Sequence, residues 1–526
     1  VEDASSWIET KYVKMKVLTY AGKKNYSDLH VRYNPSWETV DIVNAVVTSP
    51  TGEKTVLEEK EMNVMDAVWA ADAPRYPASK ILVVSLPGVE EGSVIEYTLK
   101  RTKTKRIVFS INGEFCFSDM ERIVHKRRGA SRNIFSVDGV LRSFVPIEKK
   151  TLRIILPEGL DLNISGAGAG DGSIMAGACP GSAQINSDTY TENGKVVHEF
   201  IAENVAPVFV GEMMPPWYSF NPMIFASFGT WEDYAKDVRK LFLKAAASQD
   251  RTEKRTRRLL ENTSSEYMKI TRIRDYVAKN IHEVKVAFGE MPPGYISSAD
   301  KTLLDGYGNT TDRAIVLFTM LATAGFDPEF VLASWVPPIA SLYGPLYYHP
   351  LNQWFTDALV RIKSEGRFIY LNDTDQYAAL GNTKNADHQG LVLKSGKFET
   401  IHNTSEELHD RTDVSIAIEL FDNGDAVIKN SRMVYGQDYA SFNKQFREMP
   451  PEKRSRYHQK LVSSISQAAE ALGDYRTDYE SYPGVEEFSV QAQAYATRQE
   501  NYLYLDLSGF LKTLNGVSGD VRKKPL

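Results

Sequence analysis

Apolar residues recur at every second position through much of the first 160 residues of this 526-residue chain. The pattern is clearest in Val13/Met15/Val17, Leu29/Val31/Tyr33, Ile95/Tyr97/Leu99 and Leu152/Ile154/Leu156. A period of two puts alternate side chains on opposite faces of a strand, so these segments predict half-buried strands. Turn signals separate them at Ser49-Pro50-Thr51-Gly52, Pro87-Gly88 and Asn112-Gly113 and favour antiparallel sheets over strand–helix–strand units. We therefore expect an all-β, sandwich-like N-terminal domain over residues 1–228.

Helical periodicity replaces this alternation after the proline-aromatic stretch Met214–Tyr218, and it begins near Trp231. A capping box at Thr263-Ser264-Ser265-Glu266 predicts a helix with a buried stripe at Ile270, Ile273, Val277 and Ile281. A second helix is predicted to end at Gly325, with a buried face at Ala314, Leu317, Phe318, Leu321 and Ala322. These patterns predict an α+β domain over residues 229–405.

Strand alternation returns in the last part of the chain, at Val414/Ile416/Ile418/Leu420, and resumes at Ala426/Ile428 after the turn Asp422-Asn423-Gly424-Asp425. A helix ending at Gly473 is predicted from Tyr457, Leu461, Ile465, Ala468 and Leu472. Further strands are expected at Phe488/Val490 and Leu503/Leu505/Leu507. Residues 406–526 are thus predicted to be a mainly β domain with one helix, and the fold class of the whole chain is α+β.

Charge and composition exclude several classes of function. The net charge is −6 and the sequence pI is near 6.0, so no overall positive field attracts nucleic acid. The basic runs Arg251–Arg258 and His125–Arg132 lack interleaved aromatic residues, which favours solvated faces. The glycine-rich segment from Ser165 to Ser182 misses the phosphate-loop spacing and is interpreted as a surface loop. We expect no nucleic-acid partner and no cofactor.

The cysteine spacing and the lengths of the apolar runs give no sign of a metal site, a redox site or a membrane-spanning helix. The two cysteines, Cys116 and Cys179, have no metal, redox or disulfide-scaffold spacing. The longest apolar run, Ala314–Gly325, is shorter than the about 18 residues that a spanning helix needs, so we expect no transmembrane segment. The chain begins Val1-Glu2-Asp3 without an initiator Met, which is expected of a mature chain whose signal segment has been removed.

Three groups of residues in the N-terminal region resemble a bacterial β domain of unknown function that is joined to a transglutaminase-like domain. They are Tyr76-Pro77, Leu86-Pro87-Gly88-Val89 and Gly92-Ser93-Val94-Ile95-Glu96-Tyr97. The central region resembles the transglutaminase-like, papain-like superfamily, whose motif G-x-C-x-D-x-A here reads Gly308-Asn309-Thr310-Thr311-Asp312-Arg313-Ala314. The resemblance implies an exported protein that is periplasmic, outer-membrane-associated or extracellular.

The resemblance also implies a Cys-His-Asp triad, and this sequence replaces each member. Thr310 stands at the cysteine position, Asp357 at the histidine position in Trp354–Val360, and Asn372 at the aspartate position in Tyr370–Thr374. A shift of register by one residue would make Asp373 the remnant acid. A thiol at a helix N-terminus ionises near neutral pH, whereas a threonine hydroxyl needs an adjacent base. We therefore expect no activity of the family type, with Thr310 or Thr311 serving as a helix N-cap.

Two other chemistries are open to this region. His349 would act as the base for Thr310 if its loop folded over the site, and His388 offers no better signal. Asp357, Asp373 and Asp375 would form a carboxylate cluster for calcium or glycoside cleavage, but their spacing fits neither motif. We expect no metal site.

A binding role is the remaining expectation for the central domain. Between Trp335 and Phe355, aromatic residues and prolines crowd a segment that looks too broken for a helix and that would rim a cleft. The candidate contacts are Trp335, Tyr343, Tyr347, Tyr348, His349 and Trp354. Alternatively, Trp335 and Trp354 are core residues at strand ends. We expect a catalytically inactive binding or scaffold protein for a protein, peptide or cell-envelope ligand; the alternatives are a hydrolase or acyl transferase with a Thr310 nucleophile, and a structural spacer.

Overall fold

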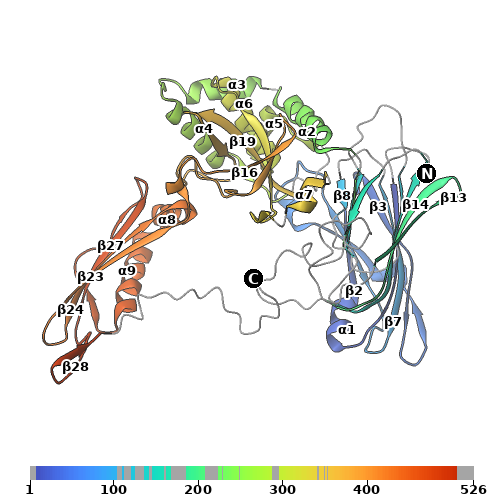
Figure 1. Ribbon diagram of the computed structural model, residues 1–526, viewed down its shortest axis with the longest axis horizontal. Coiled ribbons are helices and arrows are strands. Elements are labelled where there is room, and N and C mark those ends of the chain that lie inside the picture. The colour runs from blue at the N-terminus through green and yellow to red at the C-terminus, as the bar shows by residue number, and fades with distance from the viewer. Residues whose placement is uncertain are drawn as a thin grey trace.

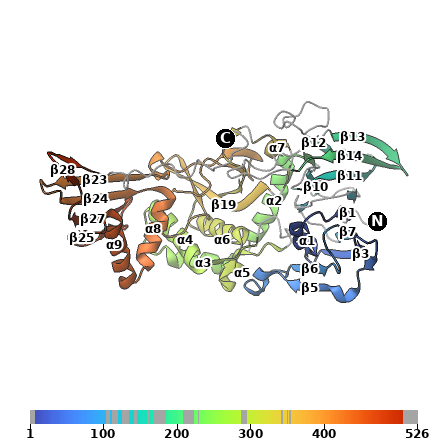
Figure 2. The ribbon, with the colours of Figure 1, turned by 90° about the horizontal axis from the view of Figure 1, so that it is seen from below.

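Strands and helices are grouped along the chain into three domains that lie in a row, with the helix-rich one in the middle (Figures 1 and 2). The computed structural model describes residues 7–103, 109–111, 120–124, 135–140, 145–158, 162–166, 185–207, 223–227, 229–247, 249–286, 295–340, 343–348, 350–351 and 354–505. The chain is therefore an α+β multidomain protein, as the sequence predicts. No helix in these ranges is both long and apolar enough to cross a membrane.

The N-terminal domain is built on a large twisted sheet, which in the described residues has eight strands in the order β13-β14-β11-β9-β1-β7-β3-β4. Its strands are β1 (Trp7–Lys16), β3 (Glu38–Thr48), β4 (Lys54–Val56), β7 (Val94–Lys103), β9 (Met120–Val124), β11 (Ile147–Pro157), β13 (Ile185–Glu192) and β14 (Lys195–Val205). Its neighbouring strands are antiparallel except β9 and β11, which are parallel. The prediction of a wholly antiparallel sheet therefore fails at that pair.

Two smaller sheets cover this large sheet, which makes the domain sandwich-like. One contains β12 (Asn163–Gly166), β15 (Met223–Ser227), β10 (Phe135–Val140) and β8 (Phe109–Ile111), and the other contains β2 (Asp28–Tyr33), β6 (Lys80–Ser85) and β5 (Met62–Asp66). Ile154 of β11 packs with Ile224 of β15 in one core, and Ile95 of β7 packs with Val84 of β6 in the other. The domain also contains short helical turns at α1 (Tyr20–Tyr26), η1 (Glu59–Glu61) and η2 (Val68–Ala71).

The central domain has an antiparallel sheet with the strand order β20-β19-β18-β21-β22, and helices pack on one of its faces (Figure 1). Its strands are β18 (Glu329–Ser334), β19 (Phe355–Ser364), β20 (Arg367–Leu371), β21 (Gln389–Val392) and β22 (Lys397–Thr400), with a separate pair β16 (His282–Glu283) and β17 (Tyr307–Gly308). Its helices are α2 (Trp231–Ala246), α3 (Asp250–Leu259), α4 (Glu266–Asn280), α5 (Ala299–Asp305), α6 (Thr310–Thr323) and α7 (Gly344–Tyr348).

The two predicted helices of this domain are α4 and α6. The whole predicted stripe of α4, including Ile270 and Val277, is buried. Its N-cap is Ser265, whose side chain accepts a hydrogen bond from the backbone N–H of Met268, so the prediction that Thr263 caps it is wrong. On α6 the predicted residues Ala314, Leu317 and Leu321 are buried and Phe318 is partly buried, whereas Ala322, in the last turn, is exposed.

The C-terminal domain is a sheet with two helices on it. It contains β23 (Thr412–Leu420), β24 (Ala426–Val434), β25 (Ala469–Ala471), β26 (Arg476–Asp478), β27 (Gly484–Ala492), β28 (Thr497–Gln499), β29 (Tyr502–Tyr504), α8 (Gly436–Glu448), α9 (Pro451–Ile465) and the short turn η8 (Glu406–Leu408). The predicted hairpin of β23 and β24 is present. The prediction of one helix is wrong, and Ala468 and Leu472 lie beyond the end of α9.

Several sequence features lie outside the described residues. They are Cys116, Cys179, the run His125–Arg132, the stretch Met214–Tyr218, His349, Leu507 and the glycine-rich segment beyond its first two residues. The basic run Arg251–Arg258 forms most of α3, where its arginines are exposed, as predicted.

Candidate functional site

The N-terminus of α6 holds the first predicted position of the triad. The Asn309 side chain caps the helix by accepting a hydrogen bond of 2.9 Å from the backbone N–H of Asp312. Thr310 is therefore the first residue of the helix, and the prediction of a cap at Thr310 or Thr311 is wrong, since asparagine precedes them and caps at least as well. In the described part of the chain, the buried hydroxyl oxygens of Thr310 and Thr311 have no hydrogen-bond partner.

Asp357, the second position, lies beside a bulge in β19. Ala333 of β18 pairs with Asp357 and Ser334 pairs with Phe355, so Thr356 has no opposite residue. Bulges change the direction in which nearby side chains point. Burial, together with the negative charge of Asp373, raises the pKa of the Asp357 carboxyl. A carboxylate in this environment accepts a proton more readily than that of an ordinary aspartate. It still lacks the imidazole group of the histidine expected at this position.

Asn372, the third position, joins the other two segments. Its Nδ2 donates hydrogen bonds of 2.7 Å to the backbone carbonyl of Thr310 and of 2.7 Å to that of Ala358, next to Asp357. Its backbone has a φ of 102°, a conformation that asparagine tolerates better than most residues. Its Oδ1 is buried without a partner among the described residues. The structure thus brings together the segments that carry Thr310, Asp357 and Asn372.

Asp373 has a different set of contacts. Its Oδ2 accepts hydrogen bonds from the Thr383 hydroxyl, from the Lys384 backbone N–H at 2.9 Å and from the Asn385 side chain at 3.0 Å. These donors belong to the turn at residues 383–385. The Asp373 carboxylate oxygen therefore stabilises that turn and has a structural role. Asn372, and not Asp373, contacts the start of α6, which favours the register without a shift.

A buried ion pair that sequence reasoning missed lies next to these positions. Arg313, one turn after Thr310 on α6, donates to Glu283 of β16 at 2.7 Å. Burial lowers the pKa of Arg313, although Glu283 opposes the shift. The carboxylates of Asp357 and Asp375 also act on this guanidinium. The signal was available, because Arg313 falls inside the quoted motif at a spacing that shares a helix face with Thr310.

The predicted rim residues are spread between core and surface. Trp354 is 0% exposed and packs against Phe225 and Trp335 with tilted rings, so its assignment to a rim is wrong and the core alternative holds for it. Trp335 and Tyr343 are partly buried against the same core, whereas Tyr347 is exposed. Contrary to expectation, part of this segment forms the short helix α7, which ends at Tyr348. A ligand role for Tyr348 and His349 stays a prediction.

Neither alternative chemistry gains a partner from the described contacts. His388 bonds through Nδ1 to the Ser334 carbonyl at 3.1 Å, which is a structural contact. In the ranges that the structure describes, no group of three or more His, Cys, Asp or Glu side chains is arranged to hold a metal ion. Among the described residues, the site contains a buried hydroxyl without a hydrogen-bond partner, an amide that donates to two backbone carbonyls, and charged groups around them.

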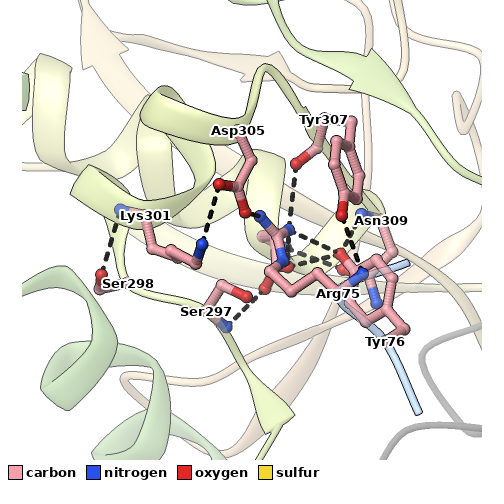
Figure 3. A network of polar contacts seen from close by, with 9 residues as sticks. Arg75, Tyr76, Ser297, Ser298, Lys301, Asp305, Tyr307 and Asn309 are labelled. Carbon is pink, nitrogen blue, oxygen red and sulfur yellow. Dashed lines mark hydrogen bonds and ion pairs between the residues drawn. The ribbon is translucent and has the colours of Figure 1, made fainter. Parts of the chain in front are cut away.

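A segment of the N-terminal domain also reaches this site, which the sequence did not suggest (Figure 3). Arg75 and Tyr76 both bond to the carboxylate of Asp312 on α6, at 2.8 and 2.5 Å. A side chain at Gly308 would collide with Asp312 and Thr302, with Cβ distances of 2.9 and 3.0 Å. The glycine of the motif is therefore required where the two domains meet.

Replacing Asp357 by asparagine should make the chain more stable near neutral pH than the native protein. A folded-state pKa above the unfolded value means that native stability falls as pH rises from about 4, and the variant lacks this loss. Denaturant unfolding at several pH values would measure it, with Asp422→Asn in an exposed turn as the control. A variant less stable than the native chain near neutral pH would mean that Arg313 holds Asp357 as a needed anion.

Comparison with known proteins adds a family for the N-terminal part and a fold for the whole. Residues 3–209 match the family described as a domain of unknown function with a solved structure, DUF3857. No curated protein matches the chain. A solved structure from Cytophaga hutchinsonii titled a "putative cysteine protease" has 10% identity and a TM-score of only 0.18 over 76% of this chain and 82% of its own.

The informative neighbour is a crystal structure titled a "putative protease" from Parabacteroides distasonis ATCC 8503. It has 13% identity and a TM-score of 0.58, with 93% of this chain and 90% of that chain covered. Identity at this level carries fold information only. The chain therefore combines a DUF3857 match in its first domain with an overall fold similar to that of this neighbour.

Proposed function

We propose that this chain is a catalytically inactive transglutaminase-like protein that is exported and binds a peptide or cell-envelope ligand at its former catalytic position. The observation that carries the proposal is the state of Thr310. Its hydroxyl oxygen is buried and has no hydrogen-bond partner in the described part of the chain, so no side chain there is placed to activate it as a base. The motif spacing from Gly308 to Ala314 and the contact of Asn372 with Thr310 support the family assignment.

Binding is supported by unpaired polar atoms around the same helix start. The Oγ1 of Thr310, the Oδ1 of Asn372 and the Oδ1 of Asp373 are buried and unpartnered in the described structure. Buried polar atoms are normally hydrogen-bonded, and those that are not call for an explanation by function, water or ligand. Polar groups of a peptide would satisfy them. The structural-spacer alternative predicts no such ligand.

The enzyme alternative is tested with the native chain and the Thr310→Ala variant. We expect no hydrolysis of peptide or ester substrates above background by either protein, because the hydroxyl lacks a base. Turnover by the native chain that Thr310→Ala abolishes would overturn the proposal and favour a threonine nucleophile with an unidentified base, such as His349.

The site assignment is tested by putting back the missing groups. Thr310→Cys should give a thiol that iodoacetamide labels well below the usual thiol pKa of about 8.5, because it begins a helix. Adding Asp357→His should give hydrolysis that iodoacetamide blocks, since the Oδ1 of Asn372 is free to orient an imidazole as in Cys-His-Asn proteases. Cys116→Ser and Cys179→Ser remove the native thiols. An unreactive introduced thiol would contradict the assignment.

Ligand binding is tested with soluble peptidoglycan fragments and calorimetry. We expect binding by the native chain and a loss of about tenfold or more in Thr310→Val, which keeps the shape and removes the hydroxyl. Thr271→Val, on the exposed side of α4, is the control. No binding of these fragments or of unstructured peptides would favour the spacer alternative.

A further inference from the structure

We propose that Arg75 and Tyr76 of the N-terminal domain are positioning residues that fix the N-terminus of α6, so that the candidate site is completed by both domains. The two residues precede β6 in the N-terminal domain, and they reach the central domain beside the motif Gly308–Ala314 (Figure 3). This inference does not depend on whether the site binds or reacts.

The contact converges on one carboxylate. The Asp312 side chain is 1% exposed, and its Oδ2 accepts hydrogen bonds from Arg75 Nη2 at 2.8 Å and from the Tyr76 hydroxyl at 2.5 Å. Its Oδ1 accepts from the backbone N–H of Ser297 at 2.8 Å. The Tyr76 hydroxyl in turn accepts from the backbone N–H of Asn309 at 2.8 Å. Tyr76 therefore contacts the N-cap Asn309, one residue before Thr310, and Asp312, two residues after it.

Arg75 ties the same region to the preceding helix. Its Nη1 donates to Asp305 at 2.6 Å, and its Nη2 also donates to the Tyr307 carbonyl at 3.0 Å. The guanidinium lies 5.0 Å from the ring centre of Tyr76 and 4.8 Å from that of Tyr307. Burial would lower the pKa of Arg75, but the charge of Asp312 and the other partners outweigh it, so the cation is retained. Both partners of the ion pair are thus held in place from several sides.

An apolar cluster that includes Tyr76 lies next to this network. Trp37, Ala73 and Tyr76 of the N-terminal domain pack with Val284 and Val286 of the central domain, and all five are nearly fully buried. Domains that meet only through polar surface tend to move relative to each other, whereas a buried apolar interface holds them together. The ion pair and the phenol therefore lie in a largely buried interface.

The consequence concerns the geometry at Thr310. Its neighbours Asn309 and Asp312 are held by the N-terminal domain, while its own carbonyl is held by Asn372 of the central domain. Removing the first set leaves the helix start with the contacts made by Asn372, by the Ser297 backbone and by Glu283, all of them from the central domain. Because coupling between sites is reciprocal, a ligand that shifts this turn would also be sensed at Arg75 and Tyr76.

The test is hydrogen exchange of the full chain with Tyr76→Phe, which keeps the ring and removes the hydroxyl. We expect exchange in the segment 305–316 to become about tenfold faster while α2 and β18 remain as in the native chain. A merely structural role would loosen both domains together. Tyr12→Phe, which removes an exposed phenol–Glu96 bond in the same domain, is the matched control and should leave 305–316 unchanged.

Arg75 provides a second measurement. Arg75→Lys keeps the charge and should retain part of the protection at 305–316, whereas Arg75→Met should lose it. In the Thr310→Cys background, Tyr76→Phe should also raise the pKa of the introduced thiol, as followed by iodoacetamide labelling against pH. Native-like exchange and an unchanged thiol pKa in the Tyr76 and Arg75 variants would overturn the proposal.

Discussion

Replacing Asp312 by alanine should lower the free energy of unfolding by about 3–5 kcal/mol, because it removes one of the two carboxylates that pair with the mostly buried guanidinium of Arg75. The carboxylate receives bonds from Arg75, Tyr76 and the Ser297 backbone, and all of these donors would lose an acceptor at once. Asp305 would still hold Arg75, but only from the other side. Urea unfolding monitored by tryptophan fluorescence would measure the loss as a lower midpoint.

The matched control for this change is Asp327→Ala. Asp327 also forms an ion pair, with Lys394 at 3.2 Å, but its side chain is 88% exposed. Exposed pairs contribute little, so we expect a change within about 0.5 kcal/mol. An Asp312→Ala loss as small as that of the control would show that water replaces the carboxylate, and the interface between the two domains would then be open to solvent.

Local periodicity predicted the elements of this fold well. Val13, Ile95 and Ile154 were assigned to half-buried strands from a period of two, and each is 0% exposed in a sheet. The stripe of α4 was equally predictable. Both successes have one cause, since the spacing of side chains along a strand or helix fixes which residues share a face.

Element ends and long-range pairing were less predictable. Leu472 continues the helical spacing of α9, yet the chain leaves the helix after Ile465 and forms β25, which pairs with β27. A cap was expected at Thr263, whereas Ser265 provides it. At Leu472 the pairing of β25 with β27 overrides the helical spacing, and at the start of α4 a serine two residues after Thr263 satisfies the same capping rule.

Contacts between residues far apart in the sequence were also hard to predict in the candidate site. Motif spacing placed Thr310 and Asn372 in one site, and they do meet. The bond from Tyr76 to Asp312 joins residues 236 positions apart and belongs to no local pattern. Sequence reasoning also treated Asn372 as a lost negative charge. It could not show that the Asn372 amide donates hydrogen bonds to two backbone carbonyls, those of Thr310 and Ala358.

Because of these two hydrogen bonds, the substitution Asn372→Asp should also have a large effect on stability. Near neutral pH it should lower the free energy of unfolding by about 3–5 kcal/mol, because two buried hydrogen bonds are lost and an anion faces two carbonyl oxygens. Burial against these oxygens should raise the pKa of the introduced carboxyl above its unfolded value of about 3.9. The folded variant then binds the proton more tightly, so its deficit should grow as pH rises from about 4 and shrink in acid.

Asn443→Asp is the matched control, because Asn443 is also buried and also donates to a backbone carbonyl, that of Tyr377 at 2.8 Å. There Arg447 already donates to the side-chain oxygen and would neutralise the new charge, so a smaller loss is expected. Equal losses at the two positions would remove the special role of Asn372. A larger loss at Asn372 would mean that an acid at this position breaks the contact that now holds β19, β20 and the start of α6 together.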